Sequence, residues 1–195
     1  LAIEGRLAAV ICVEDPLREE AADAVRELKE AGITKVVMMT GDSERTAAAI
    51  AKRVGVDEYY SEVLPEDKAS FVEKEKKLGH KVIMIGDGIN DSLALSSASV
   101  GIAISDGAAI AREIADVTIS ADNLHEIVTL KRLSTALMKR IHNNYRTIIG
   151  VNGGLIALGV TGVIMPTTSA LLHNLSTLTI SLRSMRNLLP KEEEI

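Results

Sequence analysis

Aromatic residues, cysteine and net positive charge are all scarce in this chain of 195 residues. Aromatic side chains make up 2% of the sequence and tryptophan is absent, which argues against base-stacking platforms and aromatic ligand cages. The net charge is −5, whereas a general nucleic-acid-binding protein needs a basic face, so no nucleic-acid partner is expected. The single cysteine, Cys12, cannot form an internal disulfide, and packing in the core of a protein from a reducing compartment suits it best.

The sequence does not begin with methionine, and its first residues do not have the pattern of a secretory leader. Leu1 opens directly into an apolar run typical of a strand, so no signal peptide is predicted. The missing methionine suggests that the chain is a fragment of a longer protein. With 47% hydrophobic residues the chain can bury one good core with a small appendage, and it is not predicted to be disordered.

The first two-thirds of the chain alternate short apolar runs with amphipathic stretches. This pattern is typical of an α/β fold whose parallel sheet is covered on both faces, with ligands at the carboxyl ends of the strands. Asp15 is the expected N-cap of the first helix, and Gly32 is expected at its end. Strands are predicted at 6–13, 34–42, 81–88, 99–104 and 116–119, and helices at 15–32, 43–56, 65–80, 89–98 and 106–115.

A long uncharged segment follows. Between Thr147 and Leu182 there is no Asp, Glu, Lys or Arg, and Pro166 divides this stretch near its middle. Two helices of about 18 residues each would just cross a hydrocarbon core of about 30 Å, which predicts a two-helix transmembrane hairpin. Basic residues on both flanks place both of its ends in the cytoplasm. The alternative is a soluble helical hairpin buried against the α/β domain.

Polar motifs occur where the predicted strands end, and the sequence GDGIND carries the strongest signal. Asp87 closes a predicted strand and can direct its carboxylate at Mg²⁺, a hard cation that prefers oxygen ligands. The glycines on either side of it let the backbone approach closely, and Asp91 can orient the same ion directly or through water. The motif therefore predicts a magnesium site.

Two further motifs supply groups for a phosphate. In TGD, Thr40 offers its hydroxyl and its backbone N–H to phosphate oxygens, and Gly41 permits the tight turn. In PEDK, Lys68 opens a helix from which it can neutralise a phosphate and a nearby carboxylate. A phosphoryl group in transfer needs a metal ion, a cation and hydrogen-bond donors. Taken singly, each motif is more often a helix cap or a solvated loop.

Together, and in this order, the motifs DPLR, TGD, PEDK and GDGINDSLAL resemble the phosphorylation domain of P-type cation pumps, which belongs to the haloacid-dehalogenase-like superfamily. The ending LRSMRNLL is similar to that of the heavy-metal branch. The resemblance implies a phosphate site formed by Thr40, Gly41, Asp42, Lys68 and Asn90, supported by Asp15 and Arg18, with Mg²⁺ at Asp87 and Asp91.

The same resemblance implies the organisation and setting of the chain. Residues 1–125 would be the C-terminal part of the phosphorylation domain, with a Rossmann-like parallel sheet, and 126–146 a connecting helix. Residues 147–189 would form the transmembrane hairpin and 190–195 a polar tail. Mg²⁺ and ATP are the implied cofactors and the lipid bilayer an implied partner. The implied location is the plasma membrane, with the α/β domain in the cytoplasm.

One departure from the family is decisive. Its nucleophile is the first aspartate of a DKTGT motif, which does not occur in this sequence. Without that carboxylate the covalent route through an aspartyl-phosphate is closed. The aspartate, the nucleotide-binding and actuator domains and the other membrane helices are therefore expected in a missing N-terminal portion, and the isolated chain is expected to be inactive.

The second predicted membrane helix carries residues that the resemblance places near a transported metal ion. Imidazole with oxygen and amide donors suits zinc, cobalt, nickel, iron or manganese better than copper(I). Asn174 stands where the family has an acidic residue, which leaves the metal open. As an alternative, His173 is a packed side chain, although ionisable groups within membrane spans are usually functional. The candidate ligands are His173, Asn174, Ser176, Thr177 and Asn152.

Three functions follow from these patterns. The first is a segment of an ATP-driven transition-metal pump. The second is a soluble phosphatase of the same superfamily, which would need a DxD motif early in the chain; Glu14 and Asp15 are adjacent and do not provide that spacing. The third is a non-catalytic module that regulates or assembles with a complete pump.

Overall fold

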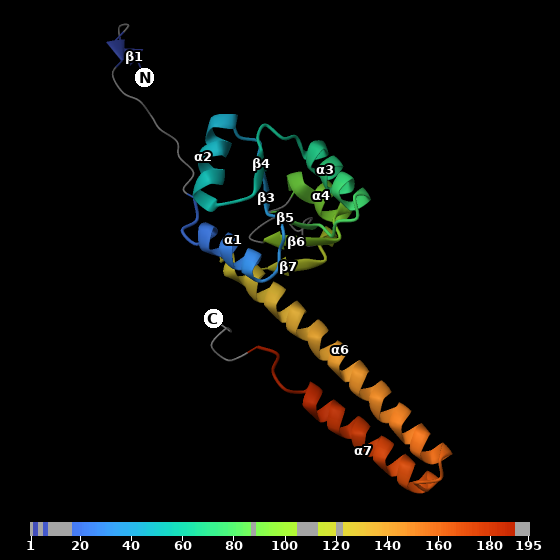
Figure 1. The fold of residues 1–195 in the computed structure, drawn as a ribbon. Coiled ribbons are helices and arrows are strands. Elements are labelled where there is room, and N and C mark those ends of the chain that lie inside the picture. Colours follow the sequence, from blue (N-terminus) through green and yellow to red (C-terminus); the bar gives the residue numbers. More distant parts are fainter. Residues whose placement is uncertain are drawn as a thin grey trace. The chain divides into compact units, whose positions relative to one another are not determined.

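The computed structural model of the chain describes residues 2–3, 6–7, 17–86, 89–104, 113–119 and 123–189. The chain divides into two compact units, Leu1–His125 and Glu126–Ile195. In chain order the elements of the first unit are β1 (Ala2–Ile3), β2 (Arg6–Leu7), α1 (Ala21–Glu30), β3 (Val37–Met39), α2 (Glu44–Val54), β4 (Glu58–Tyr60), α3 (Pro65–Lys77), β5 (Ile83–Gly86), the 3₁₀ turn η1 (Ile89–Asp91), α4 (Ser92–Ser97), β6 (Val100–Ile104) and β7 (Val117–Ile119) (Figure 1).

Parallel strand pairing confirms the predicted α/β class. β3 pairs in parallel with β4, and β5, β6 and β7 form a parallel sheet in that order. Ile102, at the centre of β6, lies opposite Ile85 on one side and Val117 on the other. β3, β5 and β6 are short apolar runs, as expected for parallel strands that are covered by helices.

The N-terminal strand differs from the prediction. β2 pairs with β1 antiparallel, because only two residues separate the strands and a parallel pair needs a far longer crossover. Residues 8–16, which include Cys12 and Asp15, lie outside the described part of the chain.

α1 begins at Ala21 rather than near Pro16, so the expected helix start was wrong. The Ala21 N–H donates to the Arg18 carbonyl at 3.1 Å, which forms a turn, and the helical pattern begins when Ala24 donates to Glu20 at 2.9 Å. Ala21 and Ala24 are buried whereas Arg18 is exposed, so packing supports the helix only from Ala21 onward.

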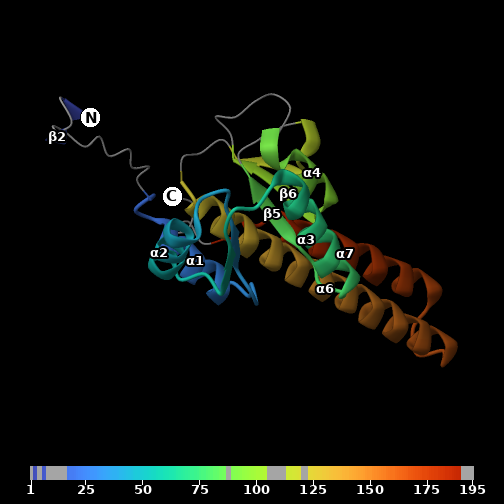
Figure 2. The same cartoon turned by 90° about the horizontal axis from the view of Figure 1, so that it is seen from above.

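Helices α3 and α4 lie side by side and pack near β5 and β6 (Figures 1 and 2). Ala69 and Val72 of α3 and Ala94 of α4 form a buried apolar cluster, and Met84 of β5 packs against it. Gly101 of β6 fits against the backbone of α4: a Cβ added there would lie 2.7 Å from the Leu95 carbonyl oxygen. The middle of α4, at Leu95, therefore lies directly against β6.

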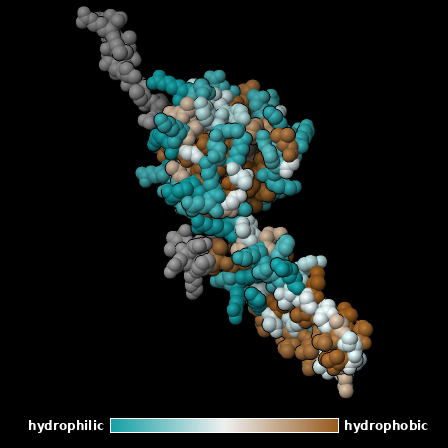
Figure 3. All heavy atoms as spheres, in the orientation of Figure 1, coloured by the Kyte–Doolittle hydropathy of each residue, from teal (hydrophilic) through white to brown (hydrophobic). Residues whose placement is uncertain are grey.

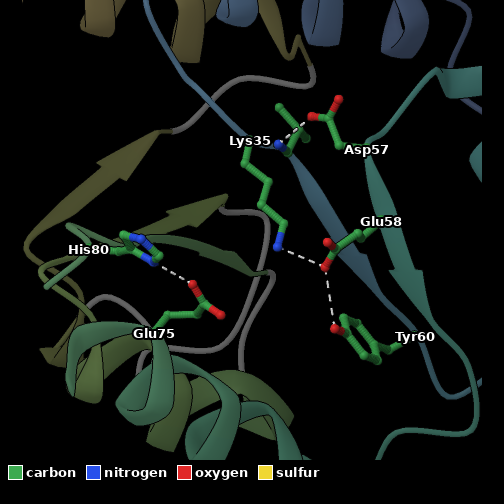
Figure 4. Close-up of polar contacts among 7 residues, drawn as sticks. Lys35, Asp57, Glu58, Tyr60, Glu75 and His80 are labelled. Carbon is green, nitrogen blue, oxygen red and sulfur yellow. Dashed lines mark hydrogen bonds and ion pairs between the residues drawn. The ribbon is translucent and has the colours of Figure 1, made fainter. Parts of the chain in front are cut away.

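Polar contacts join the beginnings of β3 and β4 (Figure 4). The Nζ of Lys35 lies 2.8 Å from a carboxylate oxygen of Glu58 and lowers the pKa of that carboxyl. Asp57 accepts hydrogen bonds from the Val36 N–H and from the Nζ of Lys29, each at 2.7 Å. The hydrogen bond from Lys29, followed by that from Val36, lowers the pKa of Asp57 below its ordinary value of 3.8.

We expect Asp57→Asn to lower the urea midpoint of unfolding near pH 7 and to have a smaller effect near pH 3. A carboxyl whose pKa is lowered by folding stabilises the folded state above its ordinary pKa, and that contribution is lost as the pH falls through the folded value. Urea titrations of both proteins at the two pH values measure the difference. An equal loss at both would contradict the assignment.

The second unit is a pair of helices, α6 (His125–Val160) and α7 (Pro166–Ser184). The predicted connecting helix and first membrane segment run on as the single helix α6. Pro166 is the first residue of α7, where its missing N–H costs no hydrogen bond. Toward the turn that joins the helices, much of the visible surface is apolar (Figure 3). Within the described ranges, no helix is both long enough and apolar enough to span a membrane.

Candidate functional site

A largely buried ion pair joins α3 to the turn before α4. The Nζ of Lys68 lies 2.8 Å from Oδ1 of Asp91, and the two side chains are 15% and 11% exposed. Pro65 starts α3, and the carboxylate of Asp67 accepts a hydrogen bond from the Leu64 N–H at 3.2 Å. This cap fixes the first turn of the helix, which carries Lys68.

Asp91 is the one polar or charged residue that is buried among those the structure describes, at 8% exposure. The end of β5 approaches it closely, since a Cβ on Gly86 would lie 2.7 Å from Asp91 Oδ2. Leu95, four residues after Asp91, is only 1% exposed, and its burial holds α4 and the preceding turn in place. Gly86 is one of the two glycines beside Asp87 that were expected to permit a close approach of the backbone, although it was not named among the site residues.

The other residues of GDGIND are placed less completely. Asn90 lies in η1 and is exposed, whereas Asp87 and Gly88 lie outside the described residues. The pairing of Asp87 with Asp91 around Mg²⁺ therefore stays a prediction. Within the described ranges, no three His, Cys, Asp or Glu side chains gather as a metal site requires.

The TGD loop is held by the segment that follows β4. The Thr40 hydroxyl donates to an Asp42 carboxylate oxygen at 2.8 Å and accepts from the Asp42 N–H at 3.1 Å. The Glu62 N–H donates to the Asp42 carbonyl at 2.9 Å, and Val63 donates to the Thr40 carbonyl at 3.0 Å. Glu62 has φ of 53°, an unusual value for a residue with a side chain, and the sequence gives no signal for it.

One detail of the Thr40 prediction was wrong. Its backbone N–H, expected to face phosphate oxygens, donates to the Tyr60 carbonyl at 3.0 Å. The pairing of β3 with β4 continues one residue past Met39 and uses this donor. The Thr40 hydroxyl and the turn at Gly41 are what the loop can offer a ligand.

The predicted phosphate-site residues make their hydrogen bonds and ion pairs with different partners. Within the part of the chain that the structure describes, no hydrogen bond or ion pair joins the Thr40 loop to the Lys68–Asp91 pair. Arg18, expected to support the site, lies 3.8 Å from a carboxylate oxygen of Glu20. Asp15 lies outside the described residues.

In the second unit, the structure brings together two of the proposed metal ligands. Nδ1 of His173 on α7 lies 2.9 Å from Oδ1 of Asn152 on α6. The hydroxyls of Ser176 and Thr177 donate to the His173 carbonyl at 2.8 and 3.0 Å. Asn174 is exposed on α7. His173 and Asn152 thus form a polar pair within a segment without charged residues.

Comparison with known proteins gives relatives for almost the whole chain. It is 37% identical over 187 residues to a zinc-exporting P-type ATPase of Mycobacterium marinum, covering 95% of this chain and 26% of the relative. It is 45% identical over 171 residues to copper-transporting ATPase 2 of Rhizobium meliloti, covering 88% of this chain and 20% of the relative. The chain therefore spans about a quarter or less of the length of these relatives.

Solved structures give the same similarity. A zinc-transporting PIB-type ATPase in its E2.Pi state matches with a TM-score of 0.82 and 34% identity, over 91% of this chain and 29% of that one. The family model of the haloacid dehalogenase-like hydrolases matches residues 1–99, slightly more than half of the chain. The parallel α/β fold and the buried lysine–aspartate pair agree with this match, and the chain belongs to the haloacid dehalogenase-like hydrolase family.

Proposed function

We propose that this chain is a segment of an ATP-driven transition-metal pump, and that its first unit forms part of the pocket around an aspartyl-phosphate. The observation that carries this proposal is the ion pair between Lys68 and Asp91, which keeps a cation and a carboxylate largely out of water beside the end of β5. Such fixed charges stabilise a phosphoryl group in transfer without reorganising during the reaction.

In this proposal Lys68 meets the phosphoryl oxygens. One of its N–H donors is held by Asp91, which orients the ammonium group and leaves two donors for the phosphate. Asn90 would add donors, the Thr40 hydroxyl would join them once its proton turns from the Asp42 carboxylate to the phosphate, and Gly41 would leave room for the ligand. The phosphorylated aspartate comes from outside these 195 residues, since they contain no DKTGT motif.

The residues around Asp91 fit Mg²⁺. While Oδ1 accepts from Lys68, Oδ2 lies against Gly86, at the end of the strand that leads to Asp87. Carboxylate oxygens are the ligands that Mg²⁺ prefers, and Asp87 and Asp91 would hold the ion. When bound, Mg²⁺ would neutralise charge on the phosphoryl oxygens of a group that comes from ATP.

We assign the second unit to the membrane region of the pump at the plasma membrane, with the first unit in the cytoplasm. Many large apolar side chains are exposed on α6 and α7, including Ile149, Ile156, Leu171, Leu175 and Leu178. Apolar surface on this scale marks a site of contact with protein or lipid. The polar residues between them would face other helices of the pump.

A chimaera tests this function. The chain would replace the matching 187-residue segment of the Mycobacterium marinum relative, and metal-dependent ATP hydrolysis would be measured in vesicles. We expect turnover by the chimaera and none by the isolated chain. ATP hydrolysis by the isolated chain, or a stable but inactive chimaera, would contradict the proposal.

His173→Ala in the same chimaera tests the proposed ion path. We expect the metal concentration that gives half-maximal ATPase stimulation to rise about tenfold or more, because losing a polar group at a metal site usually costs that much. Thr179→Ala, on the same helix, is the matched control, since its hydroxyl donates only to the Leu175 carbonyl. Unchanged stimulation by His173→Ala would remove this residue from the ion path.

A further inference from the structure

The second unit contains a cavity of about 420 Å³ between the last part of α7 and the middle of α6. Four cationic side chains line it, and none of the lining residues within the described part of the chain is a carboxylate. Asn143 and Asn144 add amide groups to the wall. The cations are Lys139 and Arg140 of α6, together with Arg183 and Arg186 at the end of α7.

Arg140 gives the cavity a fixed wall. Its guanidinium donates to the Ser184 carbonyl at 3.0 Å and to the Asn187 carbonyl at 2.9 Å, and it also contacts the Arg186 carbonyl. The amide of Asn144 donates to the Ser184 hydroxyl at 2.7 Å. These bonds hold the chain after α7 against α6, so the cavity is shaped by contacts within the unit and not by surface side chains alone.

The other three cations that line the cavity are Lys139, Arg183 and Arg186. Within the described ranges, no ion pair involves Lys139, Arg183 or Arg186, and all three side chains are exposed. Cations this close repel one another unless an anion lies between them. The guanidinium group of arginine can donate two parallel hydrogen bonds to the oxygens of a phosphate, and the ammonium group of lysine adds a positive charge.

The residues that line the cavity lie just outside the two ends of the uncharged segment 147–182. Arg183 is the first charged residue after the uncharged segment that ends at Leu182, and Lys139 and Arg140 precede that segment on α6. If this segment lies in a bilayer, the cavity is at the depth of the lipid phosphates, where basic pockets between helices bind anionic head groups.

We propose that this cavity binds the phosphate group of an anionic phospholipid. The lipid assignment rests on the membrane location proposed above, whereas the binding of a phosphate rests on the four cations and the fixed wall. In that setting the lipid joins the end of α7 to α6 and makes the stability of the hairpin depend on anionic lipid.

Titration of the complete chain in neutral detergent with dihexanoyl phosphatidic acid tests the cavity, because a short-chain lipid in detergent presents no charged membrane surface. We expect saturable binding of one lipid per chain, weakened by salt. Lys139→Gln combined with Arg186→Gln should raise the Kd about tenfold or more, in line with the usual contribution of two cations at a lipid phosphate.

Lys131→Gln combined with Arg146→Gln is the matched control, because it removes the same charge from α6 outside the cavity. We expect a change in Kd of less than about threefold. Equal weakening by both pairs, or the absence of saturable binding, would overturn the proposal. Inorganic phosphate binding as tightly as phosphatidic acid would assign the cavity to free phosphate instead.

The chain's own acidic tail is the competing occupant. If phosphatidic acid binds only after Glu192, Glu193 and Glu194 are changed to Gln, the tail fills the cavity and the lipid proposal falls. Partition into uncharged phosphatidylcholine vesicles tests the membrane location separately. A chain that enters those vesicles but does not bind phosphatidic acid refutes the cavity alone, and the reverse result refutes the membrane location alone.

Discussion

Lys68→Met is expected to lower metal-dependent ATP hydrolysis by the chimaera by about 10²–10³-fold, since removing one preorganised charge-stabilising group typically costs that much. Lys68 is the cation that the structure holds beside Asp91, at 2.8 Å, and methionine keeps the length of the side chain without its charge. The rate of ATP hydrolysis at saturating metal measures the effect. Lys74→Met, an exposed lysine on the same helix, is the control and should keep full activity.

A loss of folding must be separated from a loss of catalysis here. Lys68→Met leaves the Asp91 carboxylate without its partner in a nearly buried position, which destabilises the protein. The double variant Lys68→Met with Asp91→Asn removes both charges and should recover thermal stability without recovering turnover. Near-normal turnover by the stable double variant would show that the pair serves only the fold.

Leu95→Ala is expected to lower the free energy of unfolding by about 2–5 kcal/mol, which is the usual cost of emptying a buried leucine site. Leu95 is 1% exposed, and its backbone is held by the close approach of Gly101, so the surroundings have little freedom to collapse into the space. A small domain has about 5–15 kcal/mol of stability in total, so this loss is severe. Urea titration of the purified chain measures it.

Leu93→Ala is the matched control on the same helix. Leu93 is 53% exposed, so its truncation removes much less packing and should change the urea midpoint only slightly. Equal destabilisation by the two substitutions would contradict the burial of Leu95 and the placement of α4 against the sheet.

Much of the fold followed from hydrophobic patterning. The runs around Met84 and Ile102 predicted parallel strands, the regular spacing of apolar residues predicted α2, and the acidic start and basic end of 65–80 predicted α3. β4 was not predicted: its three residues are too few to show an alternation, and its only signal was the pair Tyr59 and Tyr60, which favour strands. The start of α1 was misplaced because the capping residues around Pro16 outweighed the burial pattern, which begins at Ala21.

The sequence predicted those parts of the candidate site whose structure is set by neighbouring residues in the chain. A proline and an acidic cap predicted the helix start that carries Lys68, and the structure puts Lys68 beside the carboxylate of Asp91. The backbone contacts of Thr40 are made with Tyr60 and Val63, some twenty residues further along the chain, and no local pattern reveals such a pairing. Likewise, the cation-lined cavity of the hairpin depends on which helix faces meet.

The tight fit at Gly101 links the geometry of the proposed phosphate pocket to a residue outside it. Any side chain there would push the backbone of Leu95 outward and, through the single turn of helix between them, shift Asp91 away from Lys68. The distance between Lys68 and Asp91 therefore depends on Gly101, although Gly101 is not one of the proposed site residues. Side chains on the exposed face of this short helix, such as Leu93, are free of that constraint, whereas the backbone beneath Leu95 leaves room only for glycine.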